Sequence, residues 1–148
     1  MFSVLKTIAT RSVAIFFVLL YPMLISIYVT LPLFIGYAGY TMIRGMERRV
    51  PARVLFAFVY LCNLEVNLSL PLFLTLLATL VFYIFFYSHL AFLKRCRVCV
   101  AVITVVSIDL LYLLMILSYD FIFSTSSVGI DSLLLFSLIM DIVVAVLI

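Results

Sequence analysis

The sequence predicts an all-α integral membrane protein with about six short transmembrane helices arranged in three hairpins. Apolar residues make up 69% of the 148 residues and charged residues 10%, whereas soluble domains are about 45–50% apolar and about 25% charged. The mean hydropathy is +1.48. The uncharged runs Ser12–Ile43 and Val66–Leu93 each exceed the ~20 residues that cross a bilayer, and Val98–Tyr119 is interrupted only by Asp109. We therefore expect one polytopic membrane domain over residues 1–148.

The basic residues predict the topology. All nine fall into three groups: Lys6 and Arg11; Arg44, Arg48, Arg49 and Arg53; Lys94, Arg95 and Arg97. Because Lys and Arg stay on the cytoplasmic side of a membrane, each apolar stretch between groups must cross an even number of times. The predicted hairpins cover about 12–43, 54–93 and 98–148, in the inner (plasma) membrane with both termini cytoplasmic. The N-terminal apolar run is too long for a signal peptide, so we expect a retained first span.

The first hairpin is the shortest. Ser12–Ile43 offers 32 residues, about 48 Å of helix at ~1.5 Å per residue, for two crossings of ~30 Å. Pro22 or Pro32 could start the return helix, because proline removes a helical hydrogen bond and restricts the residue before it. The alternative is one long tilted helix, which would place the loop Arg44–Arg53 outside and break the charge rule.

The second hairpin contains an acid, Glu65, in an otherwise apolar segment. Glu65 is about 18 Å of helix beyond Arg53, short of the far surface of a ~30 Å core. Polar and apolar residues alternate strictly over Asn63–Leu70, which predicts extended chain. The candidate re-entry turn consists of Asn63, Asn67, Ser69 and Pro71. Glu65 then serves either as part of the turn or as a site presented to a partner.

The third hairpin carries four aspartates around its predicted turn, Phe123–Ser132. Asp120 and Asp131 flank this turn closely, whereas Asp109 and Asp141 lie about 20 Å of helix deeper on either side. Residues equidistant from the turn of an antiparallel hairpin lie at similar depth. We therefore predict that Asp109 and Asp141 both lie inside the membrane core.

Buried carboxyl groups need a proton or a cationic partner, and three arrangements of Asp109 and Asp141 stay open. The two side chains could face each other and share a proton, as in a proton-linked transporter. They could face outward and contact a basic residue of another subunit. Each could also be hydrogen-bonded separately and serve packing alone.

The motif Cys96-Arg97-Val98-Cys99, next to Lys94 and Arg95, allows a membrane thiol oxidoreductase, because cationic neighbours favour the reactive thiolate. Such an enzyme needs a second cysteine pair, and only Cys62 remains. The basic flank also places the motif on the reducing cytoplasmic side. We therefore favour two incidental cysteines at a helix start.

No motif for nucleotide binding, hydrolysis or metal-dependent peptidase chemistry occurs, and His89 is the only histidine. We expect no catalytic residue, cofactor, metal or nucleic-acid partner. The cytoplasmic basic loop comprises Arg44, Arg48, Arg49 and Arg53. Its positive charge suits a bilayer with anionic headgroups, although topology alone requires the same charges.

The order of elements resembles MreD, a small polytopic subunit of the bacterial rod-shape machinery. The shared layout is a proline that opens a short span (Leu31–Phe34), a basic loop (Arg44–Arg53), a helix that ends at an acid (Glu65), and a Ser-Leu-Pro-Leu-Phe entry (Ser69–Phe73) into a long apolar helix. The resemblance covers Leu31–Leu93. It implies a non-catalytic inner-membrane scaffold that associates with MreC and the synthases of peptidoglycan elongation.

Composition leads to a similar expectation. A chain with almost no mass outside the membrane and unpaired acids inside it offers surface for helix contacts rather than catalysis. We therefore predict a scaffold subunit of a multiprotein membrane complex, with other membrane proteins as partners. A small proton-linked transporter, or a transporter's membrane subunit, is the first alternative, and a thiol oxidoreductase is the second.

Overall fold

The protein is all-helical in a computed structural model that describes residues 2–28, 31–90, 96–124 and 132–147. The helices are α1 (Phe2–Ile27), α2 (Ile35–Glu47), α3 (Pro51–Asn67), α4 (Leu74–Phe82), α5 (Arg97–Phe123) and α6 (Ser132–Leu147). A π-helical segment, η1 (Tyr83–Tyr87), continues α4. No strand occurs within these ranges, which confirms the all-helical part of the predicted fold class. Lys94, Arg95, Asp131 and most of the third predicted turn lie outside the described residues.

Among the residues that the structure describes, two helices are long and apolar enough to cross a membrane, at Thr10–Ile27 and Arg97–Phe123. Only 11% of the first segment and 39% of the second is buried against the rest of the chain, so large apolar side chains face outward on both. Two shorter apolar helices cover Leu74–Tyr87 and Leu135–Leu147.

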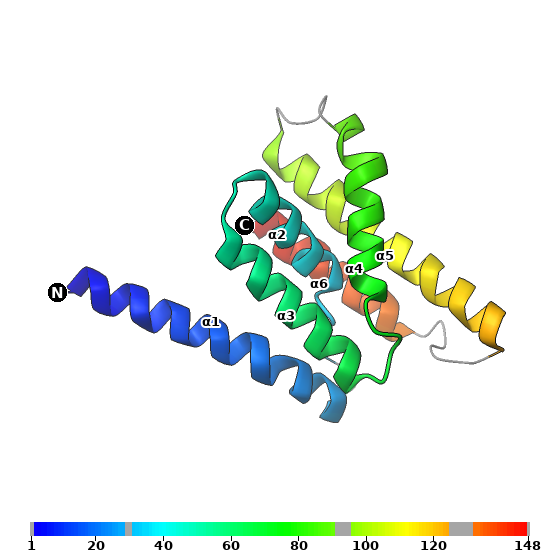
Figure 1. Cartoon of the computed structure of the whole chain (residues 1–148), viewed down its shortest axis with the longest axis horizontal. Helices are drawn as coiled ribbons and strands as arrows, with labels where there is room; N and C mark the ends of the chain where they lie inside the picture. The colour runs from blue at the N-terminus through cyan, green and yellow to red at the C-terminus, as the bar shows by residue number, and fades with distance from the viewer. Residues whose placement is uncertain (1, 29–30, 91–95, 125–131, 148) are drawn as a thin grey trace.

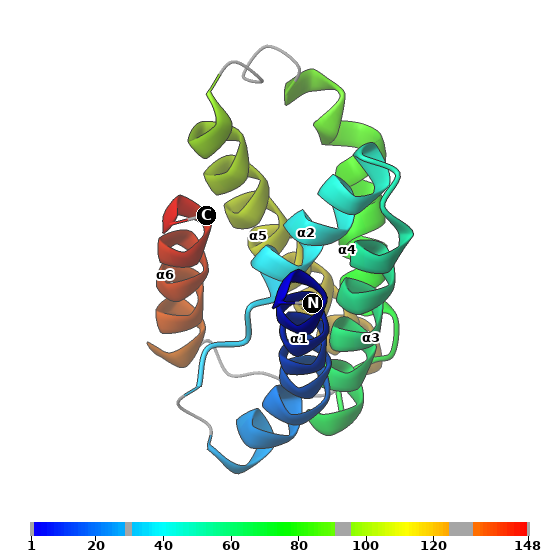
Figure 2. The same ribbon diagram turned by 90° about the vertical axis from the view of Figure 1, so that its left-hand side faces the viewer.

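Helix α2 is the central element. It packs against α3, α4, α5 and α6, while α5 also contacts α4 and α6. The long helix α1 lies along the outside of α3, and its N-terminal part extends beyond the bundle (Figure 1). Seen from the side, α6 lies across α2 from α3 and α4 (Figure 2).

The return helix of the first predicted hairpin begins after Pro32, one of its two expected starts. The other, Pro22, lies inside α1 and is buried. Two tyrosines hold the non-helical connection between α1 and α2: Tyr21 donates its hydroxyl to the Pro32 carbonyl at 2.9 Å, and Tyr60 donates to the Leu33 carbonyl at 2.8 Å. The connection therefore obtains from side chains the partners that a helix would provide.

An asparagine of α3 bonds to the turn of α1 that precedes Pro22. Proline has no N–H, so the carbonyl four residues earlier, that of Val18, loses its helical donor. The Asn63 amide nitrogen donates to Val18 O at 3.2 Å and to Leu19 O at 3.0 Å. A neighbouring helix thus satisfies carbonyl groups that the proline exposes, as an apolar environment requires.

The prediction of extended chain over Asn63–Leu70 is wrong. Helix α3 continues to Asn67, and the turn comprises residues 68–73. Each polar side chain in the helical part has a partner: Asn63 contacts α1, and the Asn67 amide donates back to Asn63 Oδ1 at 2.8 Å. The alternating pattern therefore arises because these polar side chains make separate contacts from one helix. The backbone of that helix keeps its own hydrogen bonds.

Helices α2 and α4 begin in the same way. Each follows a Leu-Pro-Leu-Phe sequence, and the phenylalanine before each helix, Phe34 or Phe73, has a left-handed backbone with φ of 51° or 68°. This conformation costs a non-glycine residue roughly 1–2 kcal/mol. The surrounding contacts must hold it in place at both helix starts.

We expect Asn63→Leu to lower the free energy of unfolding by about 1 kcal/mol, because it leaves the Val18 carbonyl without a donor. The measurement is chemical unfolding in detergent, followed by circular dichroism. Pro22→Ala restores an N–H to α1, so the cost of Asn63→Leu should shrink in that background. An equal cost in both backgrounds would contradict the assigned role of Asn63.

Candidate functional site

Glu65 caps the N-terminus of α4. Its Oε2 accepts the Phe73 N–H at 2.7 Å, and its Oε1 accepts the Thr75 N–H at 2.6 Å and the Thr75 hydroxyl at 2.7 Å. The first N–H groups of a helix lack internal acceptors and create a positive end. Glu65 is fully buried. Of the two roles expected for it, the contacts therefore favour turn chemistry over presentation to a partner.

The other members of the predicted re-entry turn divide between helix and turn. Asn63 and Asn67 belong to α3, whereas Ser69 lies in the turn with a positive φ of 53° and an exposed side chain. Pro71 comes three residues before α4 rather than within its first turn. These residues shape the connection, while Glu65 makes the hydrogen bonds to α4.

Asp141 caps α2 in the corresponding way, from helix α6. The Gly36 N–H donates to Asp141 Oδ2 at 3.1 Å, and Gly36 occupies the same second position of α2 that Thr75 occupies in α4. One turn earlier in α6, Ser137 Oγ accepts the Leu33 N–H at 2.9 Å. Helix α6 thus provides two acceptors for the start of α2.

Asp109 of α5 completes this cluster. Its carboxyl group packs directly against Gly36, where an added Cβ would lie 2.7 Å from Asp109 Oδ2. Asp141 accepts the N–H of the same glycine, so the two acids meet at Gly36. Of the three arrangements left open by the sequence, this shared contact favours the facing one.

The facing carboxyl groups leave two buried oxygens, Asp109 Oδ2 and Asp141 Oδ1, without a hydrogen-bond donor. Within the described ranges, neither acid forms an ion pair. One proton held between the two groups would supply a donor, and the N-terminus of α2 favours the remaining negative charge. The cluster can therefore fasten α2, α5 and α6 together, and it can also hold a proton.

Gly36 and Thr75, the partners of these acids, were not predicted from the sequence. The available signal was the repeated Leu-Pro-Leu-Phe, which comes two residues before each of them. After the first repeat, Gly36 leaves space for the Asp109 carboxyl group. After the second repeat, Thr75 adds a hydroxyl donor for Glu65.

The basic loop spans the end of α2 and the start of α3. Arg44 donates through Nε to the Tyr40 hydroxyl at 3.1 Å and pairs with Glu47 at 3.3 Å. Glu47 also accepts the Tyr87 hydroxyl at 2.9 Å, which ties α2 to η1. Arg48, Arg49 and Arg53 are exposed.

Cys96 and Cys99 form a disulfide at the start of α5, which differs from the expectation of two incidental cysteines on a reducing side. Cys62 is a partly buried free thiol on α3. The predicted helix start is confirmed, because α5 begins at Arg97. In the part of the chain that the structure covers, no three His, Cys, Asp or Glu side chains are grouped to hold a metal ion.

We expect Glu65→Gln to reduce the free energy of unfolding by about 1–3 kcal/mol, because an amide cannot accept all three hydrogen bonds that the carboxylate accepts. Thr75→Val removes one of the three donors and should cost less. Unfolding in detergent measures both. A Glu65→Gln variant as stable as the parent would contradict the capping role.

Gly36→Ala should cost about 1–3 kcal/mol of unfolding free energy, because its Cβ overlaps the Asp109 carboxyl group. Asp109→Ala in the same chain removes the overlap and should cancel most of this cost. Asp109→Asn keeps the shape of the carboxyl group, so the cost should persist there. Equal effects of Gly36→Ala in the two backgrounds would refute the contact.

Comparison with known proteins adds no further assignment to this site. The chain matches no protein-family model, no curated protein and no solved structure. Any function must therefore be argued from the chain's own residues: Glu65 at the start of α4, and Asp109 with Asp141 at the start of α2.

Proposed function

We propose that the chain is a non-catalytic, multi-pass scaffold subunit of a membrane protein complex. The proposal rests on one observation: the three acids hold helix starts of their own chain. Glu65, Asp141 and, through Asp141, Asp109 hold helix starts within the same chain. This polar interior makes a fixed frame, and the apolar outer faces are left for lipid and neighbouring helices.

Placement in the inner (plasma) membrane, with about six passes and both termini cytoplasmic, is part of the proposal. It is supported by the apolar helices and by their exposed faces, where Phe16, Leu114 and Phe121 are 68%, 63% and 88% exposed. The second and third basic groups also contribute arginines to one cavity. These four arginines, Arg44, Arg48, Arg53 and Arg97, therefore lie at one end of the bundle, as residues on one side of a membrane would.

The resemblance to MreD supports a more specific assignment. The residues that carry it include both Leu-Pro-Leu-Phe entries, the basic loop between α2 and α3, and Glu65. We propose on this basis that the complex belongs to the cell-shape machinery of peptidoglycan elongation, with an MreC-type protein and its synthases as partners.

A small proton-linked transporter is the second candidate, and one observation favours it. Asp109 and Asp141 face each other with two buried oxygens that lack donors, so the pair could take up and release a proton. Transport would require Asp141 to leave the Gly36 N–H in part of the cycle, because that hydrogen bond fixes the start of α2.

Photo-crosslinking in cells tests the scaffold role directly. A photoreactive residue at Phe16 of α1 or Leu114 of α5, both outward-facing, should form an adduct with a discrete membrane protein. The matched control is Leu64, which is fully buried and should form none. Adducts with lipid alone at every exposed position would contradict the proposal.

Proton flux separates the two candidates. Proteoliposomes that contain the parent chain or Asp109→Asn should show the same background proton flux, measured with a pH-sensitive dye, because a scaffold moves no proton. Asp120→Asn, on the same helix, is the control for a change of charge. Flux that is present in the parent and in Asp120→Asn but abolished in Asp109→Asn would establish the transporter instead.

A further inference from the structure

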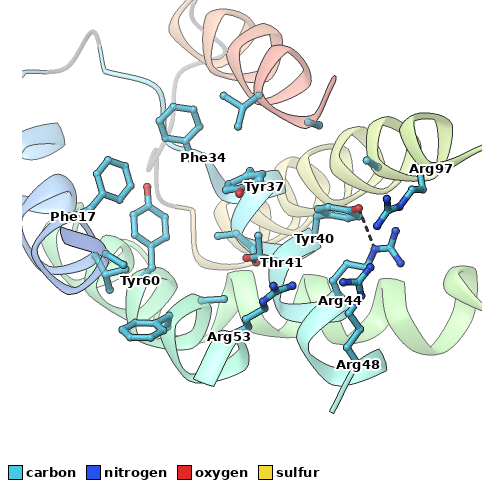
Figure 3. Close-up of a pocket in the computed structure, with 18 of the residues that line it drawn as sticks. Phe17, Phe34, Tyr37, Tyr40, Thr41, Arg44, Arg48, Arg53, Tyr60 and Arg97 are labelled. Carbon is cyan, nitrogen blue, oxygen red and sulfur yellow. Dashed lines mark hydrogen bonds between the residues drawn. The ribbon is translucent and has the colours of Figure 1, made fainter. Parts of the chain in front are cut away.

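A cavity of about 790 Å³ lies between α1, α2, α3, α5 and α6 (Figure 3). Its floor contains one buried alanine from each of four helices: Ala38, Ala57, Ala101 and Ala145. Because methyl side chains fill little of the space between helices, the cavity follows from these four residues. Its volume falls within the ~300–1,000 Å³ typical of small-molecule sites.

Four arginines line one end of this cavity: Arg44, Arg48, Arg53 and Arg97 (Figure 3). They come from α2, the α2–α3 turn, α3 and α5. Arg44 is fixed by Tyr40 and Glu47, whereas the other three have no acidic partner among the residues that the structure describes. The cavity therefore offers guanidinium groups in excess of the acids around it.

The opposite part of the cavity is apolar and aromatic. Phe17 and Val18 of α1 and Phe34 before α2 line it. Phe17 and Phe34 lie together with Tyr60, away from the arginines (Figure 3). A ligand that fills the whole cavity must therefore combine an anionic group with a hydrocarbon part.

We propose that this cavity binds one anionic phospholipid, with the phosphate at Arg48, Arg53 and Arg97 and an acyl chain along the apolar wall. One guanidinium group can donate two parallel hydrogen bonds to two oxygens of a phosphate. Basic pockets between membrane helices on the cytoplasmic side also suit anionic headgroups. A soluble phosphate would leave the apolar wall unoccupied. The inference rests on the proposed membrane placement and is independent of any protein partner.

Native mass spectrometry of the purified full chain in nonionic detergent tests this site. Phosphatidylglycerol should be retained as a single bound lipid, more tightly than zwitterionic phosphatidylcholine. Arg53→Gln with Arg97→Gln should weaken phosphatidylglycerol about tenfold or more, since ~1.4 kcal/mol corresponds to a factor of ten. The matched control is Arg11→Gln with Arg49→Gln, which removes the same charge from arginines that do not line the cavity and should change affinity less than twofold.

Three results would overturn the lipid site: equal loss in both double variants, equal binding of phosphatidylcholine, or equal binding of glycerol 3-phosphate. The last result would indicate a soluble anion as the ligand. None of them bears on crosslinking to a protein partner, so failure here is distinct from failure of the scaffold role.

A second measurement needs no substitution and covers the case in which a double variant does not fold. Photoactivatable phosphatidylglycerol bound to the parent chain should label the cavity-lining residues Ala14, Phe17, Val18, Val144 and Ala145. Labelling spread evenly over outward-facing helices such as α4, which does not line the cavity, would show general lipid contact and refute the site.

Discussion

The fold depends on one constraint: a helix that begins away from water needs acceptors for its first N–H groups. Helices α2 and α4 meet it with carboxylates from other helices, Asp141 for α2 and Glu65 for α4. A carboxylate at this position benefits from hydrogen bonds and from the positive helix end together. Because these acids come from α6 and α3, satisfying the constraint also fixes which helices lie beside one another.

The same constraint explains the polar side chains around the broken helices. Pro22 and Pro32 each interrupt the hydrogen bonding of the backbone, and the exposed groups find Asn63, Tyr21 and Tyr60 as donors. Asn63 comes from α3 and bonds to α1, whereas Tyr21 of α1 and Tyr60 of α3 both bond to the connection before α2. Backbone groups that lose their helical partners are thus satisfied by side chains of neighbouring helices.

Much of this organisation could be predicted from the sequence, because composition and charge grouping act over long stretches. The helical class, the acids Glu65, Asp109 and Asp141, and Pro32 as one of two possible starts of the return helix were all visible there. The extended segment from Asn63 was predicted wrongly, since alternation cannot show that Asn63 contacts α1 while Glu65 contacts α4. The cavity could not be predicted at all, because Ala38, Ala57, Ala101 and Ala145 have no common spacing and meet only through tertiary packing.

Helix α2 connects the two features that carry the functional proposals. Its N-terminus lies at Asp109 and Asp141, and its C-terminal end places Arg44 and Arg48 at the arginine-lined end of the cavity. Its 13 residues give a length of about 20 Å at ~1.5 Å per residue. That is close to one leaflet of a ~30 Å hydrocarbon core together with part of its headgroup layer. If the phosphate of a lipid lies at the arginine-lined end, the tip of its acyl chain would therefore lie near the depth of Asp109 and Asp141. The length of α2 thus gives a geometric reason for combining arginines at one end of the cavity with an apolar wall at the other.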